Sequence, residues 1–187
     1  MKKKTVIPVC CLLLCALLCS CTLSGTGSGG KDIALDDSYS DEYYADETKP
    51  KSRISFIVPL HGEITSPFGN RINPITKVNS FHTGVDVGVK ENTQVACAAG
   101  GVVEEVGKSN AYGNYVLVSH DENYQTYYAH CNEILVEAGT VIRQGEIIAL
   151  SGNTGSYTTG PHLHFGIIYN GNPIDPLSCL DGVSNEF

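Results

Sequence analysis

Short apolar runs separated by turn-forming residues make up most of the chain after Ile54. Runs rich in Val, Ile and Tyr alternate with Gly, Asn and Asp, and the spacing of about ten residues between turn signals is typical of antiparallel β-sheet. No segment keeps helical periodicity over about ten positions. The pattern therefore predicts one mostly β, antiparallel domain over residues 53–187, with strands at Gly101–Val106, Tyr115–His120, Gln125–His130, Ile147–Ser151 and His162–Tyr169.

Two short polar segments predict the connections between these strands. Asp121-Glu122-Asn123 separates two of the apolar runs and indicates a hairpin loop. Asn170-Gly171 is a strong turn signal, because both residue types tolerate the positive φ that tight hairpin turns require. The turn should bring a last short strand back beside His162–Tyr169.

The N-terminal residues have a different pattern, typical of an export signal. Lys2 to Lys4 precede an apolar stretch of 13 residues from Val6 to Leu18, which is short for a span of about 30 Å of hydrocarbon. Leu18-Cys19-Ser20-Cys21 resembles the bacterial lipobox. We therefore expect a lipoprotein-type signal peptide over residues 1–20, lipidation of Cys21, and an exported protein anchored by lipid at the outer face of the cytoplasmic membrane. An ordinary secretory signal and an uncleaved anchor remain alternatives.

Residues 21–52 have the composition of a flexible, acidic linker. A Gly/Ser/Thr run at residues 25–30 is followed by seven acidic residues between Asp32 and Glu47, with few large apolar side chains. Such a segment cannot offset its ordering entropy by burial. It would tether the domain to the membrane, and it could also fold back as an inhibitory segment.

Charge and cysteine content exclude several classes of protein. The net charge is −8, and removal of Lys2, Lys3 and Lys4 would make it −8 − 3 = −11, so nucleic-acid binding is not expected. Outside the leader and Cys21, three cysteines remain, at positions 97, 131 and 179. Their odd number and irregular spacing indicate no disulfide framework, although one bridge stays open, and the absence of a CxxC pair argues against a thiolate metal site.

The histidine pattern suggests a metal site. His162 and His164 lie two residues apart in a predicted strand, so their side chains share a face while Leu163 and Phe165 point to the core. His82 and Asp86 would also share a face, but in a straight strand their Cα atoms would be about 13 Å apart. Gly84 between them could permit a kink and leave room for an ion. His130, at the end of another strand, could supply a proton acceptor or donor.

Four motifs, in order, resemble those of the lysostaphin/LytM-type zinc endopeptidases. They are Ser66-Pro67-Phe68-Gly69-Asn70-Arg71, Phe81-His82-Thr83-Gly84-Val85-Asp86, Tyr128-Ala129-His130, and Gly160-Pro161-His162-Leu163-His164-Phe165. The resemblance runs from about Ile64 to Asp175. It implies a β-sheet domain with a narrow groove, Zn²⁺ as cofactor and the peptide part of peptidoglycan as substrate.

The resemblance also implies a role for each site residue. Zn²⁺ would be held by His82, Asp86 and His164. His130 and His162 would be the catalytic pair, with His162 taking the proton of water and His130 donating a hydrogen bond to the oxyanion, or the reverse. A non-hydrolytic peptidoglycan-binding or scaffold protein is the main alternative function, and a secreted peptidase for ordinary proteins is a second. His61 and His120 match no ligand position, Cys97 is expected to be buried, and Cys131 is expected to be a packing residue.

Overall fold

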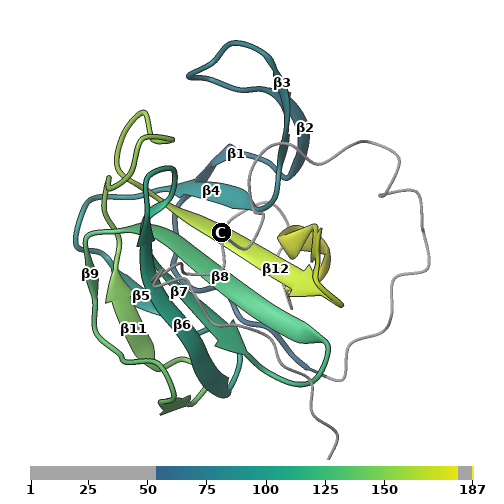
Figure 1. The fold of residues 1–187 in the computed structure, drawn as a ribbon, viewed down its shortest axis with the longest axis vertical. Helices are drawn as coiled ribbons and strands as arrows, with labels where there is room; N and C mark the ends of the chain where they lie inside the picture. Colours follow the sequence, from purple (N-terminus) through teal and green to yellow (C-terminus); the bar gives the residue numbers. More distant parts are fainter. Residues whose placement is uncertain (1–53, 181–186) are drawn as a thin grey trace, which may run out of the picture. The chain divides into compact units, whose positions relative to one another are not determined.

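The computed structural model describes residues 54–180 and Phe187, and these residues form an almost purely β domain (Figure 1). No α-helix occurs among them, and no helix there has the length and apolar character needed to cross a membrane. The elements are β1 (Glu63–Ser66), β2 (Gly69–Ile72), β3 (Asn79–His82), β4 (Val85–Gly88), β5 (Gln94–Ala96), β6 (Gly101–Ser109), β7 (Gly113–Ser119), β8 (Tyr124–Cys131), β9 (Glu133–Ile134), β10 (Val141–Ile142), β11 (Ile147–Leu150), β12 (His162–Tyr169), β13 (Asn172–Ile174) and the 3₁₀ helix η2 (Pro176–Ser178).

The main sheet has the strand order β1-β4-β12-β8-β7-β6-β10, and β13 pairs with the second half of β12. The named strand pairs are all antiparallel, as predicted. The five predicted strands are observed as β6, β7, β8, β11 and β12, with bounds that differ by three residues or fewer. Both predicted turns are also observed. Asp121 caps the β7–β8 loop by accepting from the amides of Asn123 and Tyr124, and Asn170 and Gly171 have φ of 50° and 78°.

The two faces of the main sheet have different environments. One face carries Val87, Val116, Tyr128 and Phe165 and packs in a common core with the small sheet β5-β11-β9. The other face carries a smaller apolar cluster of Tyr112, Leu117, Tyr127, Ala129 and Ile168. Side-chain alternation along β12 places His162 and His164 on the same face as the smaller cluster.

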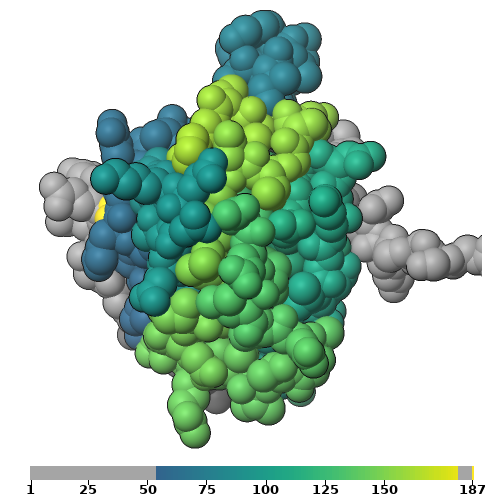
Figure 2. Space-filling model, turned by 90° about the vertical axis from the view of Figure 1, so that its left-hand side faces the viewer, coloured from purple at the N-terminus to yellow at the C-terminus, as the bar shows by residue number. Residues whose placement is uncertain are grey.

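Strands β2 and β3 form a separate two-stranded ribbon, in which Gly69 pairs with His82 and Arg71 with Ser80. The ribbon stands away from the main sheet in Figure 1 and is the projecting knob at the top of Figure 2. Its tip exposes Ile72, Ile75 and Val78. The sequence pattern does not predict this ribbon, which brings His82 to the sheet.

Candidate metal centre

Register between β4 and β12 places the first two candidate ligands opposite one another. Asp86 on β4 pairs with His164 on β12, and Gly88 pairs with His162. Leu163 and Phe165 lie in the main core, whereas both histidines are buried on the other face of the sheet. The predicted alternation along this strand is confirmed.

His82 lies beside Asp86 and His164 because the strand is interrupted between β3 and β4. The interruption is at Thr83-Gly84, so His82 and Asp86 are not on one straight strand, and the predicted kink is observed. The expectation that the missing side chain of Gly84 leaves room for an ion was wrong. A Cβ at residue 84 would lie 2.4 Å from the Phe165 carbonyl oxygen and 2.9 Å from the His164 ring. Glycine is needed because β12 and the His164 imidazole pack directly against its backbone.

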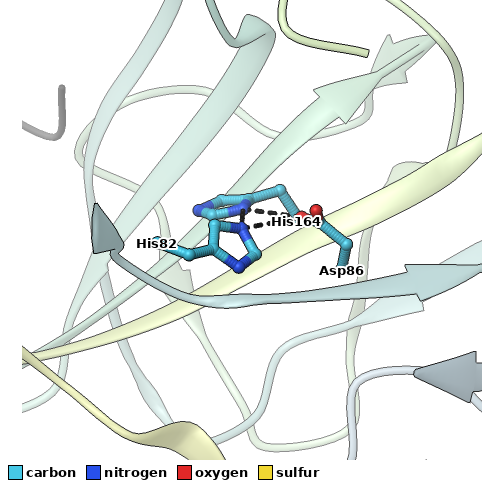
Figure 3. A group of neighbouring side chains, drawn as sticks. All are labelled: His82, Asp86 and His164. Atoms are coloured by element: carbon cyan, nitrogen blue, oxygen red, sulfur yellow. Dashed lines mark hydrogen bonds and ion pairs between the residues drawn. The ribbon is translucent and has the colours of Figure 1, made fainter. Parts of the chain in front are cut away.

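Three potential ligand atoms converge at this point (Figure 3). Nε2 of His82 lies 3.0 Å from Nδ1 of His164 and 3.1 Å from Oδ1 of Asp86, and the His164 Nδ1 to Asp86 Oδ1 distance is 2.9 Å. Four tetrahedral ligands at about 2.05 Å from Zn²⁺ would be about 3.3 Å apart, so the spacing is close to that of a zinc site. His82, Asp86 and His164 are therefore brought together as predicted.

Hydrogen bonding to His82 indicates that this set suits a cation. Nδ1 of His82 donates to the Pro67 carbonyl oxygen at 2.8 Å, which leaves Nε2 of the neutral ring with a lone pair. That lone pair faces the carboxylate oxygen Oδ1 of Asp86 at 3.1 Å. Two electron-pair donors repel at this distance, and a cation between them converts the repulsion into coordination. Two imidazoles and one carboxylate form an accepted zinc set with an open fourth position.

Burial and the neighbouring side chains together set the protonation of Asp86 and His164. Burial alone would raise the pKa of Asp86, but the adjacent His164 and His82 rings outweigh it and hold that pKa well below its ordinary value. Burial lowers the pKa of His164 to about 4, against the opposing effect of Asp86. At neutral pH the pair is thus a carboxylate and a neutral imidazole, which are the forms that bind a metal.

The two predicted catalytic histidines lie beside the cluster. The ring centroids of His130 and His162 are 4.6 Å apart, and Nε2 of His162 is 3.7 Å from Oδ1 of Asp86. Nδ1 of His130 donates to the Thr154 carbonyl oxygen at 2.7 Å, and Nδ1 of His162 donates to the Gly160 carbonyl oxygen at 2.8 Å. In the neutral form of each ring, the lone pair therefore lies on Nε2, where it can accept a proton.

The backbone of His130 is unusual for a strand residue. Its φ is 60°, and β8 contains one extra residue there, since Asn114 pairs with Cys131 but Val116 pairs with Tyr128. Such a bulge redirects a side chain at the end of a strand. Thr154 holds the bulge from the facing loop, because its hydroxyl donates to the Cys131 carbonyl and accepts from the Asn114 amide. Burial lowers the pKa of His130 to about 3, so the ring is neutral.

The remaining predicted residues lie outside this cluster. His61 is exposed, and His120 is held between the Gly100 carbonyl and the Thr126 hydroxyl. Cys97 and Cys131 are fully buried, and the two of them and Cys179 are free thiols, so the bridge left open by the sequence does not form among the described residues. Burial raises the pKa of Cys131 to about 12, which rules out a nucleophilic thiolate at neutral pH. Cys21 lies outside the described residues.

Two contributors to the site were missed. Thr154 acts through its carbonyl and hydroxyl from a distant loop, and no sequence signal marks it. Arg71 ends the first of the four motifs, but no contact was predicted for it, although its Nη1 lies 3.2 Å from Oδ2 of Asp86. Its place in that motif was the one sequence feature that pointed to a role in the site.

Comparison with known proteins agrees with this geometry. A family model described as peptidase family M23 matches residues 80–176, which include the four site histidines and Asp86. Peptidoglycan DD-endopeptidase ShyA of Vibrio cholerae is 34% identical over 153 residues, covering 80% of this chain and 35% of ShyA. The chain spans about 30% of the length of the curated relatives that it matches.

Solved structures show the same fold. A zinc-containing peptidase from Vibrio cholerae superimposes with a TM-score of 0.59 at 35% identity, covering 65% of this chain and 37% of that one. The catalytic domain of lysostaphin from Staphylococcus simulans gives a TM-score of 0.53 at 31% identity, covering 64% and 90%. The resemblance to lysostaphin-type peptidases inferred from the motifs is confirmed.

Proposed function

The chain belongs to peptidase family M23, and from this premise we propose that it is a zinc-dependent endopeptidase that hydrolyses peptide bonds of peptidoglycan. The observation that carries the proposal is the convergence of His82 Nε2, His164 Nδ1 and Asp86 Oδ1 within 3.1 Å of one another, beside the rings of His130 and His162. The named activity of ShyA supports peptidoglycan as substrate, and the zinc-containing structural neighbour supports zinc as the metal.

The residues divide into a metal-holding set and a proton-transfer pair. His82, Asp86 and His164 would hold Zn²⁺, which supplies Lewis-acid chemistry by making water acidic and polarising the scissile carbonyl. His162 accepts the water proton at Nε2, because its Nδ1 is fixed by Gly160 and its Nε2 lies next to the ligand cluster. The same ring then returns the proton to the departing amine.

His130 is proposed to interact with the oxyanion that develops on the substrate. Its Nδ1 proton is committed to Thr154, so donation from Nε2 requires a second proton on the ring. The neutral ring can only accept a proton at Nε2, so donation to the oxyanion would have to follow proton uptake by His130. The exchanged assignment, with His130 as the base, needs no prior proton on this ring. The pH dependence of the residual kcat in each single variant separates them, because loss of the base removes the acidic limb of the profile.

Two kinds of variant test the proposal. His130→Ala and His162→Ala should retain zinc but lose release of soluble muropeptides from purified cell walls, whereas His82→Ala should lose the zinc itself. Zinc content is measured by elemental analysis of the purified protein. Normal hydrolysis by both the His130 and His162 variants would contradict the mechanism. Zinc binding by the unaltered protein without muropeptide release would favour the non-hydrolytic, peptidoglycan-binding function.

We also propose that the domain works from a membrane-tethered position. The support is the sequence of residues 1–52, with a lipobox-like Cys21 followed by an acidic, Gly/Ser-containing segment. Cys21→Ser should prevent incorporation of labelled palmitate and move the protein from the membrane fraction to the soluble exported fraction. Unchanged fractionation of this variant would refute lipid anchoring.

A further inference from the structure

Arg71 contacts the carboxylate oxygen of Asp86 that does not face His82 and His164. Its Nη1 lies 3.2 Å from Oδ2 of Asp86 and also donates to the hydroxyl of Ser66. The side chains of Arg71 and Asp86 are 19% and 14% exposed, so the ion pair is shielded from water. Such a pair is more effective than an exposed one in fixing the geometry of a carboxylate.

The two oxygens of Asp86 have separate partners. Oδ1 faces the nitrogen atoms of His82 and His164, while Oδ2 is held by the guanidinium. A carboxylate that is free to rotate can offer one or both oxygens to an ion. A guanidinium bound to Oδ2 disfavours coordination through both oxygens. The number of protein donors then stays at three, and the fourth position of a tetrahedral ion stays open for water or substrate.

The fold fixes Arg71 relative to Asp86. Ser66 on β1 is the direct partner of Asp86 in the β1–β4 ladder, so Nη1 lies between two neighbouring side chains of the same sheet. Within residues 54–180, the Nε atom of Arg71 is buried without a hydrogen-bond partner. The guanidinium is therefore held in place through Nη1, by the Asp86 carboxylate and the Ser66 hydroxyl.

Resting on the metal site proposed above, we propose that Arg71 is a positioning residue that keeps Asp86 a one-oxygen ligand. Hydrogen-bonding partners of metal ligands typically change metal affinity by about 10- to 100-fold when removed. Arg71→Gln should weaken zinc binding by this factor, and Arg71→Lys should recover part of the loss because it restores the positive charge without the planar guanidinium group.

The test is metal binding to the full chain, measured by competition with a chromogenic chelator, together with the visible spectrum of the Co²⁺-substituted protein. Four-coordinate Co²⁺ absorbs more strongly than five- or six-coordinate Co²⁺. The absorption should therefore fall in Arg71→Gln, where Oδ2 becomes available to the ion. Arg143→Gln, at an exposed arginine outside the site, is the matched control and should match the unaltered protein in both measurements.

A second variant keeps the proposal testable if Arg71→Gln does not fold. Ser66→Ala keeps Arg71 but removes one of its two anchors, and it should weaken zinc binding about two- to tenfold, the worth of one hydrogen bond. Wild-type affinity and an unchanged Co²⁺ spectrum in Arg71→Gln would overturn the role of Arg71. If Arg71→Gln does not fold, an unchanged affinity in Ser66→Ala would overturn it equally. Failure of the unaltered protein to bind metal would instead overturn the proposed function.

Discussion

Replacement of Gly84 by alanine tests the claim that β12 packs directly against the β3–β4 break. An added Cβ would lie 2.4 Å from the Phe165 carbonyl oxygen and 2.9 Å from Cε1 and Nε2 of His164, whereas ordinary contacts begin at 3.4 Å. The neighbours must therefore move by about 1 Å, and overpacking of this kind costs about 1–3 kcal/mol. Since one neighbour is a ligand ring, we expect zinc affinity to fall at least tenfold.

The assay compares Gly84→Ala with the unaltered protein in two ways. Urea unfolding in the presence of a chelator gives the change in free energy of unfolding without metal, and chelator competition gives the change in zinc affinity. Gly100→Ala is the matched control, because its Cβ would meet only ordinary contacts at 3.5 Å and 3.6 Å. If Gly84→Ala equals this control in both quantities, the argument from close packing is refuted.

Three further predictions concern residues around the site and in the core. Thr154→Val removes the hydroxyl that hydrogen-bonds to Cys131 and Asn114, so it should lower the free energy of unfolding by about 1–2 kcal/mol. It should also reduce muropeptide release while the zinc content stays unchanged. Unaltered turnover would show that the Thr154 hydroxyl does not position His130. Burial lowers the pKa of His120, so the unfolded state binds the proton more tightly, and the free energy of unfolding of metal-free protein should fall as the pH drops below about 6.5. His120→Gln should reduce this slope, and an identical slope would contradict it. Native Cys131 should resist thiol alkylation at pH 7.5 and react after unfolding, as mass spectrometry of the modified peptide can show; rapid native alkylation would refute its burial.

The long strands could be predicted because their pattern is local. β12 places Leu163, Phe165 and Ile167 on one face with a period of two, and turn residues separate the long strands. Both the strands and the position of His162 and His164 on one face could therefore be predicted from the sequence. Residues 1–53 and 181–186 lie outside the described residues, and the signal peptide and linker stay predictions.

The short elements could not be predicted because they depend on distant contacts. β2 and β3 each contain four residues with mixed polarity, and they form a ribbon because they pair with each other. The reason for glycine at position 84 was predicted wrongly for the same reason. The atoms that exclude a side chain there belong to Phe165 and His164, about 80 positions away. The left-handed backbone of His130 likewise depends on Thr154, which no local pattern connects to it.

The separate β2–β3 ribbon has a consequence for the energetics of metal binding. It pairs with no strand of the main sheet, yet it carries His82, while Asp86 and His164 belong to that sheet. An ion held by all three residues would connect the ribbon to the sheet. Its binding free energy would therefore stabilise the packing of the ribbon against the sheet. At a free metal concentration of a hundred times Kd this linkage is worth about 2.7 kcal/mol. Chelation should therefore accelerate hydrogen exchange in the ribbon before it affects β8 or β12.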